Sequence, residues 1–122
     1  MHIRFYRNLK GGGMKKDLDS YLLTKQEHMI MKIIWERGGA TVKEVCDILS
    51  KRKLMAYTTV LTFMQILERK GVLSRKLIGR THHYSPVLSK RQATRNQLKD
   101  LLDRYCEGNP NTLIAAVLEK EL

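Results

Sequence analysis

Three threonines and a glutamine lie at helical spacing between residues 57 and 71. Thr58, Thr59 and Thr62 place short hydroxyl side chains near the start of this stretch, and Gln65 follows later in it. Short polar side chains at the start of a helix can reach base edges in the DNA major groove, where hydroxyls bond several bases and the threonine methyl contacts the thymine methyl. We therefore predict a recognition helix, with these residues as base or phosphate contacts.

The same residues also have purely structural interpretations. Thr58 could act only as the N-cap of the helix, because a threonine hydroxyl at that position accepts a hydrogen bond from the backbone. Tyr57 could contact a phosphate or simply fill the turn before the helix, and Gln65 could remain solvated. The sequence alone leaves these choices open.

A basic hairpin is expected directly after this helix, between residues 72 and 87. Two short strands flank Ile78-Gly79-Arg80, where the glycine supplies the backbone freedom that a tight turn needs. Arg80 at the tip is the strongest candidate for a phosphate or minor-groove contact. The full set of expected DNA backbone contacts comprises Lys51, Arg52, Lys53, Arg75, Lys76 and Arg80.

The order of the expected elements is that of a winged helix-turn-helix domain. Capping boxes at Thr24-Lys25-Gln26-Glu27 and Thr41-Val42-Lys43-Glu44 each begin a helix ahead of the recognition helix and the hairpin. The segment around Ala40 is expected to add a third short strand. We predict a mainly α fold with a small β-hairpin wing over residues 21–88, a module that puts a helix into the DNA major groove.

Positive charge is concentrated on this predicted domain. The chain carries a net charge of +11, of which residues 21–88 contribute +7, residues 1–20 contribute +3 and residues 89–122 contribute +1. A basic excess confined to one module favours phosphate neutralisation over general solubility. The first 20 residues contain a triple glycine and little apolar periodicity, so we expect a disordered N-terminal arm, with Met14 as an alternative start.

The C-terminal segment, residues 89–122, is predicted to form two amphipathic helices, one capped by Ser89 and one after Gly108-Asn109-Pro110. So short a segment cannot bury both apolar faces by itself, and we expect a homodimer in which the tails of two copies interleave. The alternative is that both helices fold back on their own winged helix. The expected dimer contacts are Leu98, Leu101, Leu102, Tyr105, Leu113, Ile114, Val117 and Leu118.

The sequence contains no convincing catalytic or metal constellation. It lacks nucleophile-elbow, phosphate-loop and zinc-protease motifs, so we expect no enzyme activity, no cofactor and no small-molecule substrate. His82 and His83 are neighbours on a strand, so their rings point to opposite faces and cannot chelate one ion together. Cys46 is expected to be buried, whereas Cys106 is a candidate for a dimer contact or a redox role. Two cysteines and no membrane-length apolar run indicate a reduced, cytoplasmic protein.

Several motifs taken together point to a known family. They are Tyr57-Thr58-Thr59-Val60-Leu61-Thr62, Leu67-Glu68-Arg69-Lys70-Gly71-Val72-Leu73, Gly79-Arg80 and Tyr84-Ser85-Pro86. With them, residues 23–118 resemble the penicillinase repressor family, which includes repressors of the BlaI, MecI and CopY types. The resemblance implies a cytoplasmic homodimer that represses transcription from inverted-repeat operators. It also implies base and phosphate contacts by Thr58, Thr59 and Thr62 and a wing contact by Arg80.

The same resemblance bears on the trigger that releases the DNA. Family members that respond to β-lactams are cut by a membrane metalloprotease sensor at an Asn-Phe bond, and Ala116-Val117 stands at the matching place. The resemblance thus implies derepression by proteolysis in the C-terminal region, in response to a β-lactam or another cell-envelope signal. Ala116 and Val117 do not match the Asn-Phe bond and do not themselves support this expectation. Copper-sensing members carry Cys-x-Cys pairs, and Cys106 stands alone. Ile66 replaces a residue that is usually basic in the family, which removes a phosphate contact.

Two other functions fit part of the pattern. The winged helix could be a protein-interaction module with the tail as its docking surface, or the protein could be a metal-responsive repressor that uses His82, His83 or the cysteines. Neither alternative accounts jointly for the hydroxyl-rich helix, the basic hairpin and the pairing tail. The main prediction is therefore a sequence-specific DNA-binding repressor whose partners are double-stranded DNA and a second copy of the chain.

Overall fold

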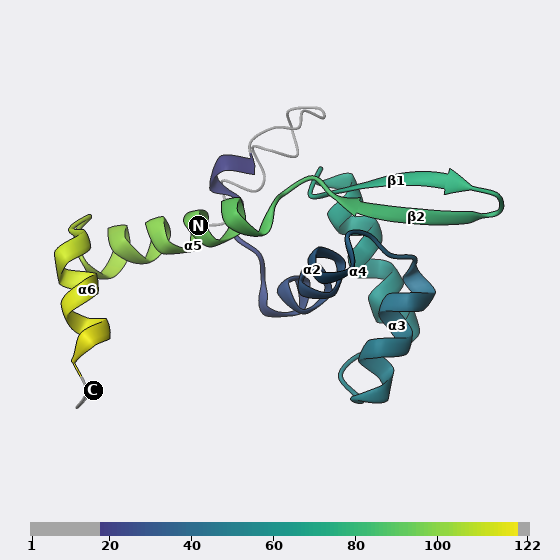
Figure 1. Ribbon diagram of the computed structural model, residues 1–122, viewed down its shortest axis with the longest axis horizontal. Coiled ribbons are helices and arrows are strands. Elements are labelled where there is room, and N and C mark those ends of the chain that lie inside the picture. Colours follow the sequence, from purple (N-terminus) through teal and green to yellow (C-terminus); the bar gives the residue numbers. More distant parts are fainter. Residues whose placement is uncertain (1–17, 120–122) are drawn as a thin grey trace.

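The computed structural model describes residues 18–119 of the 122-residue chain (Figure 1). Residues 1–17 of the predicted N-terminal arm, with Met14, lie outside the described residues. The described chain is mainly helical, with a two-stranded antiparallel hairpin and a helical C-terminal region, so the predicted fold class is confirmed. The elements in chain order are η1 (Leu18–Ser20), α2 (Lys25–Arg37), α3 (Val42–Lys51), α4 (Tyr57–Arg69), β1 (Leu73–Ile78), β2 (Thr81–Pro86), α5 (Lys90–Tyr105) and α6 (Pro110–Leu118).

Both predicted capping boxes begin helices in the structure. At the start of α2, Thr24 Oγ1 accepts from the backbone N–H of Glu27 at 3.1 Å, and Glu27 Oε1 accepts from the N–H of Thr24 at 3.0 Å. Thr41 and Glu44 make the same reciprocal bonds at the start of α3, at 3.1 and 2.9 Å. Each box satisfies N–H groups that would otherwise have no partner in the first turn. Gly38, in the left-handed conformation with φ of 81°, ends α2.

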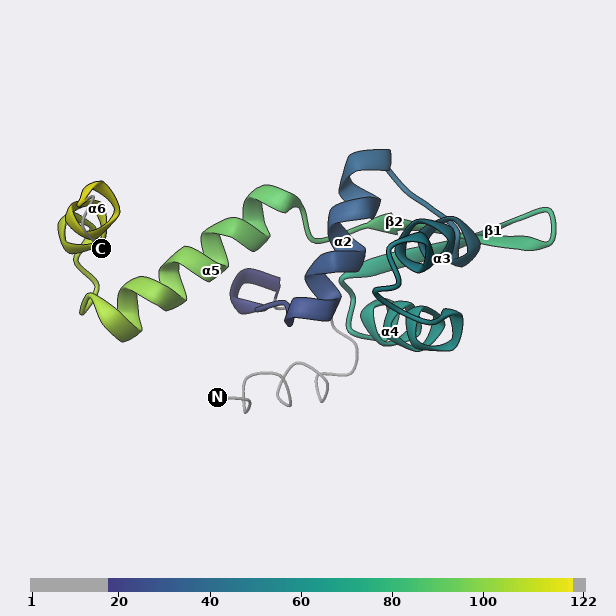
Figure 2. The same cartoon turned by 90° about the horizontal axis from the view of Figure 1, so that it is seen from below.

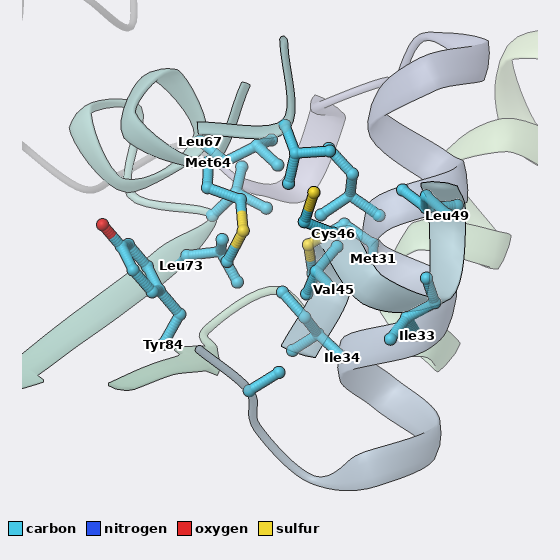
Figure 3. Packing of buried hydrophobic residues seen from close by; sticks show 14 of the residues in the cluster. Met31, Ile33, Ile34, Val45, Cys46, Leu49, Met64, Leu67, Leu73 and Tyr84 are labelled. Atoms are coloured by element: carbon cyan, nitrogen blue, oxygen red, sulfur yellow. The ribbon is translucent and has the colours of Figure 1, made fainter. Parts of the chain in front are cut away.

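The core lies between α2, α3, α4 and the base of the hairpin (Figure 3). The face of α4 that packs into it consists of Val60, Met64 and Leu67, each fully buried, as the spacing predicts. The same spacing places Leu61 in this buried set, but its side chain is only half-buried. Other buried side chains are supplied by neighbouring elements; they are Ile30, Met31, Ile34, Val45, Leu49, Leu73 and Tyr84. Packing of this apolar face fixes how α4 presents its opposite face.

The hairpin has the predicted tight turn. Its register pairs Leu73 with Pro86 at the base and Ile78 with Thr81 at the tip, so that only Gly79 and Arg80 connect the strands. Gly79 has φ of +67°, a conformation that glycine adopts without the cost that a Cβ would add. In both views the hairpin projects beyond α3 and α4 (Figures 1 and 2).

The third strand expected around Ala40 is reduced to a single isolated bridge. Ala40 pairs with Tyr84, and each backbone N–H donates to the other residue's carbonyl at 2.9 Å. A Cβ on the preceding Gly39 would stand 3.2 Å from the Tyr84 carbonyl oxygen, so the close approach of this segment to β2 favours a residue without a side chain. The bridge fastens the link between α2 and α3 to the hairpin.

The tail leaves the winged helix as the long helix α5 and turns at its far end into α6 (Figures 1 and 2). Ser89 caps α5, as predicted, because its Oγ accepts from the backbone N–H of Gln92 at 3.0 Å. Asn109 caps α6, and Pro110 occupies its first turn, where the missing N–H has no cost. No helix within residues 18–119 is long and apolar enough to cross a membrane.

One part of the predicted N-terminal arm is folded, which corrects the expectation of disorder up to residue 20. Leu18–Ser20 form a 3-10 helix, and Leu18 packs against the core. Its carbonyl oxygen, with that of Tyr21, accepts from the buried Asn96 Nδ2 at 2.8 and 3.0 Å. Because Asn96 lies on α5, the fold of residues 18–20 depends on a contact with a residue that is distant in the sequence.

Candidate nucleic-acid interface

Helix α4 begins so that all of its predicted contact residues remain available. Its N-cap is Ala56, which has no side-chain capping bond, and Thr58 lies inside the first turn. The alternative that Thr58 serves as the cap is therefore wrong. Thr58, Thr59, Thr62 and Gln65 are all exposed to solvent. The helix thus presents a polar face opposite its buried apolar one.

Tyr57 occupies the first position of α4, and its side chain is 51% exposed. A tyrosine that filled the turn before the helix would be covered by it. The phenol can instead donate a hydrogen bond to an acceptor outside the protein.

A further cation on α4 extends the polar face and is absent from the predicted contacts. Arg69 is exposed at the last position of the helix. It follows Gln65 by four residues, Gln65 follows Thr62 by three, and Thr62 follows Thr58 by four, so the four side chains share one face. The same spacing in the sequence is a signal that could have identified Arg69.

Two groups of cations flank α4. Lys51 ends α3, and Arg52 and Lys53 form the turn that leads towards α4; all three are exposed. Lys53 has φ of 54°, a left-handed conformation that closes this turn. Because α3 packs against α4, this basic turn lies next to α4.

The wing carries the second group, which the strand register divides between its two faces. Arg75 lies opposite Tyr84, and Lys76 lies opposite His83, so the two cations point to opposite faces of the hairpin. Arg80 occupies the turn at the exposed tip. The structure therefore does not place all three on one surface, although each is exposed.

The basic side chains on the turn and the wing are free to meet phosphates. Within residues 18–119, no ion pair involves any of the predicted backbone contacts, which are Lys51, Arg52, Lys53, Arg75, Lys76 and Arg80. An unpaired exposed cation can release its counterions on meeting DNA without first breaking a bond in the protein.

An ion pair supports the start of α3. Arg37 Nη2 lies 3.2 Å from Glu44 Oε2, and the backbone N–H of Thr41 donates to the other carboxylate oxygen. The bond from Thr41 is the main cause of a lowered pKa of Glu44, and Arg37 and His83 lower it further. The charged carboxylate therefore stabilises the start of the helix against which α4 packs.

The described residues offer no support for a metal centre. Across residues 18–119, no three His, Cys, Asp or Glu side chains are grouped so that they could hold an ion. Cys46 is buried, as the apolar stripe predicts, and Cys106 is buried at the C-terminal end of α5.

Comparison with known proteins agrees with this arrangement. The family model described as penicillinase repressor matches residues 23–122. The penicillinase repressor of Bacillus licheniformis is 26% identical over 99 residues, which cover 81% of this chain and 77% of that protein. The transcriptional regulator BlaI of Mycobacterium tuberculosis is 34% identical over 77 residues, covering 62% of this chain and 56% of that protein.

Solved structures of relatives share the fold of the winged helix. The solution structure of the DNA-binding domain of the repressor BlaI matches with a TM-score of 0.56 at 29% identity, covering 65% of this chain and 93% of that one. The Bacillus licheniformis BlaI monomer in complex with the blaP half-operator matches with a TM-score of 0.53 at 27% identity, covering 60% and 89%. The chain belongs to the penicillinase repressor family.

Proposed function

We propose that this protein represses transcription as a homodimer that binds inverted-repeat operators in double-stranded DNA in the cytoplasm. The observation that carries the proposal is the exposed polar face of α4, held by a fully buried apolar face and flanked by unpaired cations within residues 18–119. A related repressor has been solved with its half-operator. Family membership and the geometry of α4 thus support the same activity.

In this proposal α4 enters the major groove. Thr59 and Thr62 contact base edges, while Thr58, Tyr57 and Gln65 add base or phosphate contacts. The basic turn contacts the DNA backbone through Lys51, Arg52 and Lys53. The wing contacts it through Arg80 and through whichever of Arg75 and Lys76 lies on the face turned to the DNA. Recognition of sequence then depends on the helix, and most of the affinity depends on the cations.

The tail supports dimerisation because its apolar side chains are left uncovered. Exposed fractions reach 45% for Leu98, 71% for Tyr105, 53% for Ile114 and 71% for both Val117 and Leu118. Folding back on the chain's own winged helix would have buried them. A second copy can bury these side chains together with Leu101, Leu102 and Leu113, and its two-fold axis would set half-sites about 34 Å apart.

Proteolysis in the tail is a route to derepression that fits this design. Ala116 and Val117 are exposed on α6, and a cut between them by a membrane metalloprotease sensor would remove the end of the proposed dimer contact. Losing the dimer would separate the two DNA-binding domains and lower affinity for the paired half-sites.

Selection from a library of random duplexes tests the proposal, because it requires no assumption about the operator sequence. We expect the full chain to enrich an inverted repeat whose half-sites lie about 10 base pairs apart, centre to centre. Enrichment of no sequence motif would overturn the proposal and would favour the protein-interaction module. A single unpaired half-site would retain DNA recognition but contradict the homodimer.

A further inference from the structure

A groove of about 540 Å³ lies where the tail leaves the winged helix. Its walls come from the segment that begins α2 and from the first half of α5, and Trp35 lies in it. Apolar side chains supply much of its surface: Leu23 and Trp35 from the winged helix, and Ala93 and Leu98 from the tail helix. A volume of this size lies in the range of sites that hold small organic molecules.

The charges around this groove have one sign. Lys25, at the start of α2, and Lys90, at the start of α5, both line it, and His28 lies next to the Trp35 ring, with centroids 6.0 Å apart. No Asp or Glu is among the lining residues, and within residues 18–119 neither lysine takes part in an ion pair. An anion that reached the groove would therefore meet cations that need not first leave a partner.

We infer that this groove binds a small molecule that carries a carboxylate on an apolar ring or chain. The apolar body packs on Trp35 and Ala93, and the carboxylate pairs with Lys25 and Lys90. A second copy that placed α6 (Pro110–Leu118) in the groove would bring no charged residue to meet the lysines, because that helix contains none. This inference concerns a site other than the DNA-binding surface and does not rest on the proposed function.

Occupancy of the groove would connect the two parts of the molecule. The Trp35 Nε1–H donates to the carbonyl of Leu88 at 2.9 Å, in the short link that joins β2 to α5. A ligand that contacts both Trp35 and Ala93 would stabilise the observed placement of α5 against α2 more than any other placement.

The chain contains a single tryptophan, so the Trp35 indole gives one N–H signal in a proton–nitrogen NMR spectrum. The probe is 2-naphthoate, and 2-naphthylmethanol is a control with the same apolar body and no charge. We expect 2-naphthoate to shift the Trp35 signal saturably with one site per chain, and to bind at least tenfold more tightly than the alcohol. No saturable shift, or equal affinity for the two compounds, would overturn the inference.

Charge-reversal variants locate the site. The double variant Lys25→Glu with Lys90→Glu should weaken 2-naphthoate binding tenfold or more. A matched control, Lys32→Glu with Arg95→Glu, makes the same change on α2 and α5 at exposed positions outside the groove and should leave binding within twofold. Circular dichroism checks that both variants keep their helices.

Two results distinguish the other occupants. Equal losses in the two double variants would mean that naphthoate responds only to net charge. A Trp35 signal that shifts with protein concentration alone, together with naphthoate binding that weakens as that concentration rises, would mean that a second copy covers the groove. Either result contradicts a ligand site.

Discussion

At the scale of single residues, base recognition and phosphate neutralisation belong to different side chains in the proposed complex. Thr59 and Thr62 are exposed on α4 and contribute nothing visible to the core. Replacing either by Ala should cost about 1–3 kcal/mol in binding to the operator and little in binding to random DNA. Fluorescence anisotropy on both duplexes measures this difference, and equal losses on the two would refute a role in base recognition.

Thr58→Ala separates a contact role from a capping role. Because Ala56 is the N-cap of α4, the variant should keep the free energy of unfolding within about 0.5 kcal/mol of the original chain. Thermal or urea unfolding measures this value. A loss of about 1 kcal/mol or more would show that the hydroxyl stabilises the helix after all.

Arg80→Ala should act in a different way. The side chain lies at the tip of the wing, where in the proposed complex it meets phosphate whatever the sequence, so binding to operator and scrambled DNA should weaken by similar factors. The slope of log affinity against log salt should fall by about 1. An effect confined to the operator would instead assign Arg80 to base recognition.

Among these residues, what depends on local spacing can be predicted from the sequence. Thr59, Thr62 and Gln65 are exposed because the helical period opposes them to Val60, Met64 and Leu67. The division of Arg75 and Lys76 between the two faces of the wing is predictable in the same way, because neighbours on a strand point to opposite faces.

At the scale of elements, the capping box of α3 stabilises the helix that packs against α4. Thr41→Ala removes the bond to the N–H of Glu44, so it should lower the free energy of unfolding by about 1 kcal/mol. Chemical denaturation measures the change. Thr94→Ala, on the exposed side of α5, is a matched control that removes a hydroxyl without removing a cap.

The same capping box should make the free energy of unfolding depend on pH. The pKa of Glu44 is lowered in the folded chain, so its charge stabilises the fold above the ordinary pKa of about 4.3, and this stabilisation is lost as the pH falls through the lowered value. Glu44→Gln keeps an acceptor for the Thr41 N–H but cannot titrate. The stability difference between the two proteins should therefore be constant from pH 7 to about pH 5 and shrink below about pH 4. A difference that persists or grows in stronger acid would contradict this role.

Elements whose limits are set by neighbouring residues are predictable from the sequence. The capping boxes, the Gly79-Arg80 turn and the start of α5 at Ser89 all arise from interactions within a few positions. The 3-10 helix at Leu18–Ser20 is not predictable in this way, because it is held in part by Asn96, which lies 78 positions along the chain from Leu18. Its own sequence carries no signal that reveals that partner.

At the scale of the whole molecule, the tail should decide the oligomeric state. Val117 is 71% exposed on α6, so Val117→Glu would place a charge in the proposed dimer contact without disturbing the winged helix. Sedimentation equilibrium should show a dimer for the original chain and a monomer for this variant. Thr112→Glu, also exposed on α6, is a charge-matched control. A monomeric original chain at micromolar concentration would contradict the homodimer.

The proposed repressor requires above all a DNA surface that distinguishes one sequence from others. The most direct measurement is fluorescence anisotropy of the full chain on the selected operator and on a scrambled duplex, over a series of salt concentrations. We expect operator dissociation constants of roughly 10⁻⁸ to 10⁻¹¹ M, a stoichiometry of two chains per operator, and binding that survives scrambled competitor. Equal, weak binding to both duplexes that disappears with salt would leave only a basic surface and would contradict sequence-specific repression.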